Sequence, residues 1–406
     1  MRLNLLEGVR VVEIGAMWAG PYAARIMGDL GAEVIKLESP RKPEPVRFGY
    51  YPGADPGELP WERGGHFQKF GRNKKSLILD ITSPRGRELL YALLRKTDVL
   101  IENNTPRVRE HLGIGHADLA RECPELVVVS MPGFGDTGPY RDYLAFGLNI
   151  EGFTGISNIT GYADGTPPIR SAIPYGDPVA ALYGALTAIL GLRERRNGGT
   201  KRRFEVSQHE GLVSLLPEIL LQAQVDHEPQ RTGNADPMFT RLQGTFADGA
   251  GGWLSLTVND DTQLWSLLTL IGGPGLEAAI SDGAAEQPLR DAIERWIAAI
   301  GADAAVRALW EAGIAAGPVL APSEMMRNEQ VVARGVYSPV PHPVAGDIPY
   351  SQLPLKYARA PSQPDVHAPL FGEHNRQLFR DVCGLSDAEI DELYATGLTS
   401  NAPDMG

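Results

Sequence analysis

Cysteine is scarce in this sequence, since Cys123 and Cys383 are the only two among 406 residues. They lie far apart and form no C-x-x-C pair, so the sequence supports neither a disulfide framework nor a zinc ribbon. Long apolar runs are also missing, because no stretch approaches the about 20 apolar residues of a membrane span. The first residues lack the apolar core of a signal peptide. We therefore expect a soluble, unprocessed protein of the reducing cytoplasm.

Positive charge is in short supply as well. The 38 lysines and arginines are outnumbered by 50 aspartates and glutamates, which gives a net charge of -12. Such a charge opposes non-specific attraction to nucleic acid or to an anionic membrane. We expect neither as a partner, and a phosphorylated ligand would need a local basic site.

Several catalytic signatures are absent. The sequence has no G-x-S-x-G or H-E-x-x-H motif and its eight histidines are scattered singly, which argues against a serine hydrolase and a zinc enzyme. The turn Gly15–Pro21 reads G-A-M-W-A-G-P, so it is neither the G-x-G-x-x-G turn of dinucleotide-binding proteins nor a P-loop. The bulk of Met17 and Trp18 also disfavours NAD, because it would obstruct a pyrophosphate.

Short β-rich segments alternate with helical ones in the first part of the chain. A strand at Val9–Ile14, a helix at Tyr22–Leu30 and a strand at Ala32–Leu37 form one βαβ unit, which predicts an α/β fold with a parallel sheet. Three strand ends open onto loops rich in Gly, Asn or Pro, where an open α/β sheet places its ligands. The pattern continues with strands at Ser76–Asp80, Asp98–Glu102 and Leu126–Ser130 and a helix at Pro84–Lys96.

The length of the chain favours two domains. We expect a large domain over residues 1–225 and 323–406 and a smaller one over 226–322, with a Pro-rich linker at 325–369 returning the chain to the large domain. The other expected elements are a helix at Pro178–Arg195, a strand at Arg203–Val206, a helix at His209–Val225, a hairpin around Gly249–Gly252, amphipathic helices through Trp265 and Trp296, and a final helical pair within Arg376–Thr396.

Asp177 allows two interpretations. It precedes Pro178 and an apolar helix, which is typical of an N-cap followed by proline at the first helical position. The amides and dipole at a helix N-terminus also favour an ionised carboxylate, and such a group is a nucleophile toward a thioester. Local sequence favours the cap.

Taken together, the chain resembles the family III CoA transferases, the group that includes formyl-CoA transferase and carnitine CoA transferase. The resemblance extends in order over nearly the whole chain. The matching phrases are Leu6–Glu13, Ala19–Pro21, Leu30–Glu38, Asn73–Ser76, Asp98–Asn103, Gly133–Gly135 with Gly138–Pro139, Gly176–Asp177, Gly313–Val319 and Ala368–His374.

This resemblance implies an open Rossmann-like parallel sheet in a CoA-binding domain built from both chain ends, a smaller α+β domain and an interlocked homodimer. It also implies that Asp177 is the nucleophile, which carries the acyl group as an anhydride and then CoA as an aspartyl-CoA thioester. Acyl-CoA and a small organic acid are the implied substrates, and no permanently bound metal or redox cofactor is required.

The CoA contacts follow from the same resemblance, by position. Two departures stand out: Ser39 and His111 occupy positions where some members have arginine. Arg107, Arg109 or Lys75 are the basic groups that would replace them. The implied contacts are Met17, Trp18, Leu79, Asp80, Ile81, Thr82, Asn103, Asn104, Thr105, Arg109, His111, Pro132, Gly133, Phe134 and Gly135.

Two other functions are considered. The family's acyl-CoA racemases carry a Gly-His-Asp phrase where this chain has Gly147-Leu148-Asn149, so that activity lacks its base. A non-catalytic subunit that pairs with a paralogous chain is the second alternative. The acids stay open: Trp18, Phe146, Phe153 and Tyr175 suit an apolar pocket, Arg170 suits a second carboxylate, and succinyl-CoA with a bulky acid acceptor is favoured.

Overall fold

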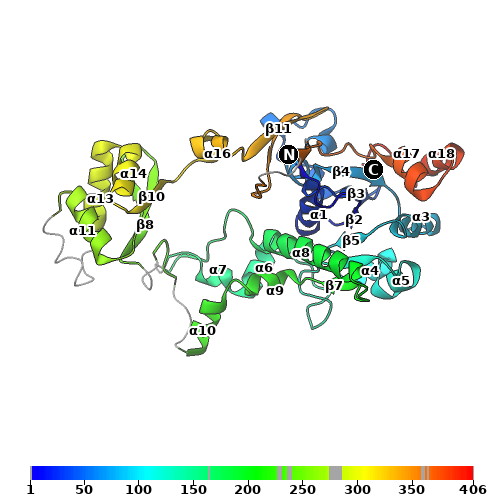
Figure 1. The fold of residues 1–406 in the computed structure, drawn as a ribbon, viewed down its shortest axis with the longest axis horizontal. Helices are drawn as coiled ribbons and strands as arrows, with labels where there is room; N and C mark the ends of the chain where they lie inside the picture. Colours follow the sequence, from blue (N-terminus) through cyan, green and yellow to red (C-terminus); the bar gives the residue numbers. More distant parts are fainter. Residues whose placement is uncertain are drawn as a thin grey trace. The chain divides into compact units, whose positions relative to one another are not determined.

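The computed structural model describes residues 2–162, 165–225, 231–235, 240–273, 286–357, 362–363 and 365–405. The chain forms two compact units. The first comprises residues 1–156, 170–221 and 335–406, and the second comprises 157–169 and 222–334. Both ends of the chain therefore belong to the first unit. Figure 1 marks the N- and C-termini near each other in this unit.

The first unit is built on a six-stranded parallel sheet, as the βαβ pattern predicts. If the six strands are numbered along the chain, their spatial order is 3-2-1-4-5-6, the order of dinucleotide-binding Rossmann folds. The strands, in spatial order, are β4 (Lys74–Ile78), β3 (Glu33–Glu38), β2 (Arg10–Ile14), β5 (Val99–Glu102), β6 (Val127–Ser130) and β7 (Arg203–Glu205).

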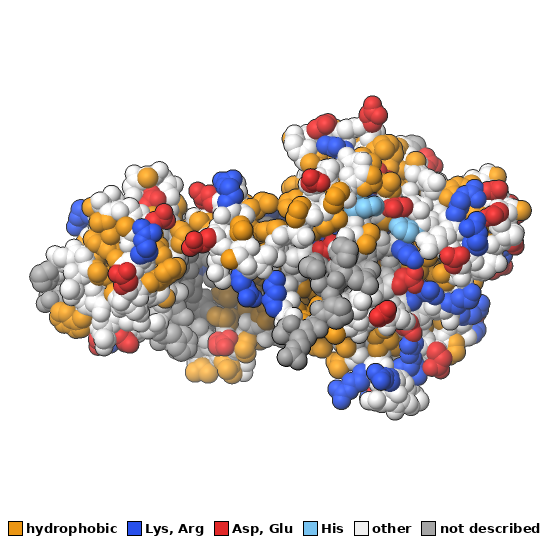
Figure 2. Space-filling model, turned by 45° about the horizontal axis from the view of Figure 1, so that its top comes forward, with side chains coloured by type: hydrophobic (Ala, Val, Ile, Leu, Met, Phe, Trp, Pro, Cys, Tyr) orange, Lys and Arg blue, Asp and Glu red, His pale blue; other side chains and the backbone are white. Residues whose placement is uncertain are grey.

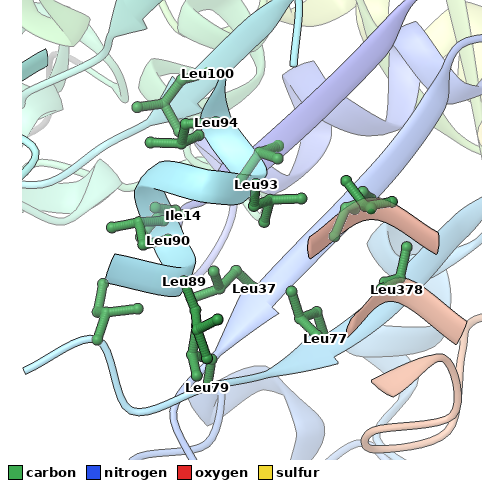
Figure 3. Close-up of a cluster of buried hydrophobic side chains, with 14 of the residues drawn as sticks. Ile14, Leu37, Leu77, Leu79, Leu89, Leu90, Leu93, Leu94, Leu100 and Leu378 are labelled. Atoms are coloured by element: carbon green, nitrogen blue, oxygen red, sulfur yellow. The ribbon is translucent and has the colours of Figure 1, made fainter. Parts of the chain in front are cut away.

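Both faces of this sheet are covered, which explains why its central strands read as nearly continuous apolar runs. Val11 and Val127 point to one face, with helices α1 (Ala19–Asp29) and α8 (Gly176–Arg196). Their neighbours Val12 and Val128 point to the other, because side chains alternate along a strand. Figure 3 shows this second layer, in which leucines of α3 (Pro84–Leu94) pack on the sheet beside Leu378.

Helix α8 packs closely against the sheet because its buried face consists of alanine and glycine. A Cβ on Gly184 would lie 2.5 Å from the Met131 Sδ atom at the end of the sheet. Small residues therefore bring the start of this helix, and Asp177 with it, against the sheet.

The C-terminal segment completes the large unit. Its last helices are α17 (Asn375–Leu378), a π-helical turn at Phe379–Cys383 (η4) and α18 (Asp387–Ala395), which confirms the expected final helical pair. The expected Pro-rich linker is more structured than predicted, because it holds α16 (Glu329–Ala333) and an antiparallel hairpin of β11 (Tyr337–His342) and β12 (Gly346–Ser351), and α15 (Pro322–Met325) ends where it begins. Residues 358–361 and 364 of that segment lie outside the described residues.

One predicted helix is wrong in its extent. The segment expected as a single helix from His209 to Val225 is divided into α9 (Gln208–Val213) and α10 (Pro217–Val225). Proline has no N–H to donate within a helix and is tolerated in the first turn. Pro217 therefore begins a new helix.

The second unit has its own core around an antiparallel sheet, with β9 in the middle. The loop at Gly249–Gly252 joins β8 to β9 as a hairpin, in agreement with the sequence. Alternation along β8 and β9 buries every second residue against three helices. The elements are β8 (Leu242–Ala247), β9 (Trp253–Val258), β10 (Ala315–Pro318), α11 (Asp261–Leu270), α13 (Glu286–Ile300) and α14 (Ala302–Glu311).

Shorter elements complete the chain: β1 (Arg2–Leu3) with β13 (Ser362–Gln363), α2 (Gly65–Gly71), α4 (Pro106–Leu112), α5 (His116–Glu122), α6 (Gly147–Thr154), α7 (Ile156–Ile159), and the 3-10 turns Pro45–Arg47, Pro52–Ala54 and Pro60–Glu62. Acidic and basic side chains are interspersed over the face drawn in Figure 2. Within the described residues, no helix is both long enough and apolar enough to cross a membrane. Cys123 and Cys383 are both free.

Candidate active site

The central strands β2 and β5 are neighbours, and their following loops meet at the point where the strand order reverses. Open α/β sheets bind ligands at this point, outside the carboxyl ends of the strands. Asn103 joins the two loops: its Oδ1 accepts a hydrogen bond from Ala16 N at 2.9 Å, and its Nδ2 donates to Ala16 O at 2.9 Å. Asn104 adds a third link by donating from Nδ2 to Ile14 O at 3.0 Å.

Two buried charged side chains, Glu44 and Lys36, also hydrogen-bond to the backbone of the turn after β2. Glu44 Oε1 accepts a hydrogen bond from Met17 N at 2.6 Å, and Lys36 Nζ donates to Gly15 O at 3.1 Å. Lys36 in turn bonds to Glu13 Oε1 at 2.8 Å and Glu44 Oε2 at 2.9 Å. Met17 has a φ of 67°, a conformation that costs energy for a side chain of this size. The charged groups therefore fix a strained turn.

A cavity of about 380 Å³ opens beside this turn. Most of its lining is neutral or apolar, and its acidic and basic members are His66, Arg170 and Asp177. All of its lining residues belong to the first unit. They are Ala16, Met17, Trp18, Val46, His66, Asn103, Asn104, Thr105, Val108, Gly133, Tyr143, Leu144, Ala145, Phe146, Gly147, Leu148, Arg170, Pro174, Asp177 and Gln208.

Asp177 does not cap its helix, contrary to the interpretation that local sequence favours. Helix α8 begins one residue earlier, at Gly176, and its N-cap Tyr175 makes no side-chain cap bond. The Asp177 carboxylate instead accepts a hydrogen bond from the backbone of Ala19, the first residue of α1. The side chain thus bridges the starts of two helices that pack on the same face of the sheet.

Burial raises the pKa of Asp177 from its ordinary 3.8 to about 6. Hydrogen bonds from the backbone of Ala19 and of Asp177 itself oppose this rise, and the negative charge of Glu151 adds to it. The sequence predicted that the helix N-terminus would favour the ionised form. The structure shows that desolvation outweighs that effect, although a group with a pKa of about 6 is still mostly ionised at neutral pH.

Glu151 of α6 also holds the segment that leads into Asp177. Its buried Oε1 accepts hydrogen bonds from Tyr175 N at 2.8 Å and from Ser171 Oγ at 3.2 Å. Ser171 Oγ also bonds to Ile173 O at 2.6 Å. Residues 171–175, which connect Arg170 to Asp177, are therefore anchored on α6.

The structure brings six of the sequence-predicted CoA contacts to this cavity with Asp177. They are Met17, Trp18, Asn103, Asn104, Thr105 and Gly133. Of the residues proposed for an apolar pocket, Trp18 and Phe146 line it, together with Arg170, whereas Phe153 and Tyr175 do not.

Leu79, Asp80, Ile81 and Thr82 do not line the cavity. The side chains of Leu79 and Ile81 belong to the buried core of the large unit. Asp80 is also buried, and its Oδ1 accepts hydrogen bonds from Thr82 N at 3.0 Å and Thr82 Oγ1 at 2.5 Å.

Arg109, predicted as a CoA contact, is already paired with acidic side chains and is not free to bind a phosphate. Its guanidinium is buried, lies 3.2 Å from Glu102 Oε1 and also pairs with Asp136. His111 is exposed at the end of α4. Neither lines the cavity.

Three predicted contacts after β6 also lie outside the cavity lining: Pro132, Phe134 and Gly135. The Phe134 ring packs edge-on against Phe153, with 5.0 Å between ring centroids. Pro132 O accepts a hydrogen bond from Gln208 N. The turn after β6 therefore packs against the start of α9 through this hydrogen bond.

Among the residues of the site that sequence reasoning missed are Glu44, His66, Gly147 and Glu151. The acid Glu151 within an otherwise apolar helical segment was a signal that went unused. His66 stacks on Tyr50 with 4.5 Å between ring centroids. Burial lowers the pKa of His66, and the positive charge of Lys69 lowers it further. Gly147 is required by a close approach, because a Cβ there would lie 2.5 Å from Asp177 Oδ2 and would also clash with Pro174.

The site thus consists of a partly buried carboxylate in a cavity at the switch point of a Rossmann-like sheet, where proteins of this α/β class bind their ligands. No cluster of potential metal ligands occurs within the described residues. Comparison with known proteins names the group. The chain belongs to CoA-transferase family III, whose model matches residues 6–375, so the family expected from the sequence is confirmed.

Relatives cover almost the whole chain. It is 32% identical to the succinyl-CoA–D-citramalate CoA-transferase of Chloroflexus aurantiacus over 398 residues, 96% of this chain and 97% of the relative. It is 27% identical to the alpha subunit of succinyl-CoA–L-malate CoA-transferase from Chloroflexus aurantiacus, over 96% of this chain and 91% of that one. A CAIB/BAIF family protein from Brucella suis has a similar structure, with a TM-score of 0.82 and 25% identity over 94% of this chain and 100% of that one.

The close approach at Gly147 generates the first prediction. Replacing Gly147 with Ala places a methyl group against the Asp177 carboxylate, and displacement of a reacting group by about 1 Å costs roughly 100-fold in rate. We predict a kcat for CoA transfer lowered by about that factor, measured by acyl-CoA exchange. Gly152→Ala is the matched control on the same helix, because a Cβ there meets nothing within 4 Å. Equal rates for the two variants would refute this steric role.

The raised pKa of Asp177 predicts a pH-dependent effect on stability. The folded state holds the proton more tightly than the unfolded chain, so the cost of burying the charge is absent below the ordinary pKa of 3.8 and complete above about 6. Asp177→Asn removes that cost. We predict that the variant is more stable than the wild type by about 2 kcal/mol at pH 7.5 and by little at pH 4. Urea unfolding at both pH values measures this, and a pH-independent difference would contradict it.

Proposed function

We propose that Asp177 is the nucleophile of a CoA transfer reaction. The observation that supports this role is its position: a partly buried carboxylate in the cavity at the switch point, with a pKa raised to about 6. Loss of solvation makes a carboxylate a stronger nucleophile, and at neutral pH this one is still mostly ionised.

In the first half-reaction, an Asp177 oxygen attacks the thioester carbonyl of the donor. The C–S bond breaks, CoA leaves as a thiolate, and an acyl-aspartyl anhydride forms. The thiolate then attacks the Asp177 carbonyl of this anhydride, so that the free donor acid departs and an aspartyl-CoA thioester remains. The donor acid carries away one oxygen atom of Asp177.

The second half-reaction reverses these steps with the acceptor. Its carboxylate attacks the aspartyl-CoA carbonyl and releases CoA thiolate, which gives a second anhydride. The thiolate attacks the acceptor's carbonyl, the new acyl-CoA leaves, and Asp177 is regenerated with one oxygen atom from the acceptor. The apolar lining of the cavity favours this chemistry by limiting hydrolysis of the intermediates.

We propose that the reactive end of CoA binds along the loops after β2 and β5, against Met17, Trp18, Asn103, Asn104, Thr105 and Gly133. The indole N–H of Trp18 is buried and has no acceptor among the described residues. The remaining sequence-based contacts, which include His111 and residues 79–82, rest on the family resemblance.

Succinyl-CoA is the proposed donor. Two relatives that match the chain over 96% of its length are named for transfer from succinyl-CoA. The L-malate enzyme is named as an alpha subunit, so a hetero-oligomer with a paralogous chain is the second candidate, in which this chain alone would not exchange CoA.

An interlocked homodimer is the proposed assembly. Helix α8 carries a row of apolar side chains on its outer face, Leu182, Tyr183, Leu186 and Leu190, which are between 41% and 59% exposed. With Leu215 and Val179, the first three line a second hollow. Exposed apolar surface of this kind marks an interface, and the proposed occupant is a second copy of the chain.

Oxygen exchange tests the covalent mechanism. Wild-type protein incubated with succinyl-CoA and an acceptor labelled with a heavy oxygen isotope in its carboxylate should transfer one labelled atom to the peptide that contains Asp177, as read by mass spectrometry. Asp177→Asn should abolish CoA exchange. Exchange without labelling of Asp177 would refute the anhydride steps, and bound CoA without exchange by the purified chain would favour the hetero-oligomer.

The interlocked dimer has its own test. Threaded chains cannot separate without unfolding, so light scattering should give the mass of two chains on dilution to nanomolar concentration. Monomers should form only together with loss of the helical circular dichroism signal. Leu186→Glu should lower the yield of folded dimer, because it places a charge in the interface. A monomer that keeps its circular dichroism would contradict the threading.

A further inference from the structure

Arg170 is the one permanent cation among the described residues that line the cavity of Asp177. Its side chain is exposed, and no hydrogen-bond or ion-pair partner is recorded for its guanidinium within the described part of the chain. Arg47, Arg72 and Arg109 of the large unit differ, because each is buried and forms an ion pair. A guanidinium in a cavity with an apolar lining is suited to bind a carboxylate through two parallel hydrogen bonds.

Arg170 lines this cavity without pairing with the nucleophile. Among the described residues, no ion pair joins the two side chains, and the pKa of Asp177 responds to burial, to hydrogen bonds from the backbone of Ala19 and of Asp177 itself, and to the charge of Glu151. A cation in contact with Asp177 would have lowered that pKa strongly. Both groups line one cavity, and the segment between them is anchored on Glu151. A ligand that contacts both Asp177 and Arg170 needs a thioester or carboxylate at one end and a second anionic group at the other.

The proposed reaction uses this cavity twice. The donor acid must leave before the acceptor attacks the same Asp177 carbonyl, so both acids occupy the same space in turn. Arg170 in this cavity would therefore contact the distal end of the acceptor as well as the distal end of the donor.

We propose that Arg170 binds the second carboxylate of the substrate, and that the protein exchanges CoA between two dicarboxylic acids. The inference rests on the proposed function of Asp177, and it adds the acceptor class and the residue that selects it. Arg170 acts on specificity, whereas bond making and breaking remain with Asp177 and CoA.

Succinyl-CoA and butyryl-CoA form a matched pair of probes, because a methyl group replaces the distal carboxylate on a chain of the same length. Exchange of isotope-labelled succinate into succinyl-CoA, and of labelled butyrate into butyryl-CoA, gives kcat/KM for each acid. We expect the wild type to prefer succinate. Arg170→Leu should lose about 100-fold with succinate, as expected for a charged hydrogen-bonded contact, and keep its activity with butyrate. Arg170→Lys should restore part of the loss.

Arg196→Leu is the control for the loss of one positive charge. Arg196 is exposed at the far end of the helix that carries Asp177 and does not line the cavity, so this variant should match the wild type with both acids. Equal losses with succinate and butyrate in Arg170→Leu, or a wild type that prefers butyrate, would overturn the assignment and leave the Asp177 mechanism intact. No exchange of any acid by the wild type would overturn the proposed function itself.

Discussion

A buried carboxylate shared by two lysines organises the large unit. Glu13, Lys36 and Lys74 lie on the adjacent strands β2, β3 and β4, and Glu13 bonds to Lys36 at 2.8 Å and to Lys74 at 2.5 Å. All three are nearly inaccessible to solvent, and an unpaired charge at such a site costs about 3–5 kcal/mol. The ion pairs therefore require these strands to keep their register. Through Lys36 and Glu44 they also require the turn at Gly15–Met17 to keep its strained conformation.

The remainder of the site is built on that fixed turn. Asn103 bonds to both backbone groups of Ala16, so the loop after β5 takes its position from the loop after β2. On the other side, the small inner face of α8 lets Asp177 approach the first turn of α1. Glu151 then anchors the segment before Asp177 from within α6. These polar contacts hold the turn after β2, the loop after β5 and the segment before Asp177, which limits the reorganisation needed during the reaction.

The sequence predicted the sheet because its strands are short apolar runs that end at Gly, Asn or Pro, and this signal is local. The role of nucleophile came to Asp177 from the family resemblance and stays a prediction, while the local interpretation of this residue as a cap was wrong. Its partner is Ala19, and a contact across 158 positions leaves no trace in the residues around it. Arg109 illustrates the same limit: it reads as a free cation near a strand end, but it pairs with Glu102 and Asp136. The need for glycine at position 147 likewise arises only from packing.

The electrostatics of the cavity reconcile two demands that oppose each other. Nucleophilic attack needs a carboxylate that is poorly solvated, and poor solvation raises its pKa and depletes the ionised form. A pKa of about 6 leaves roughly nine-tenths of Asp177 ionised at pH 7. A cation beside Asp177 would increase that fraction, but it would also neutralise the charge that attacks the thioester. Arg170 lines the same cavity without that pairing, so the proposed nucleophile keeps its charge while a positive charge is available to the proposed dicarboxylic substrate.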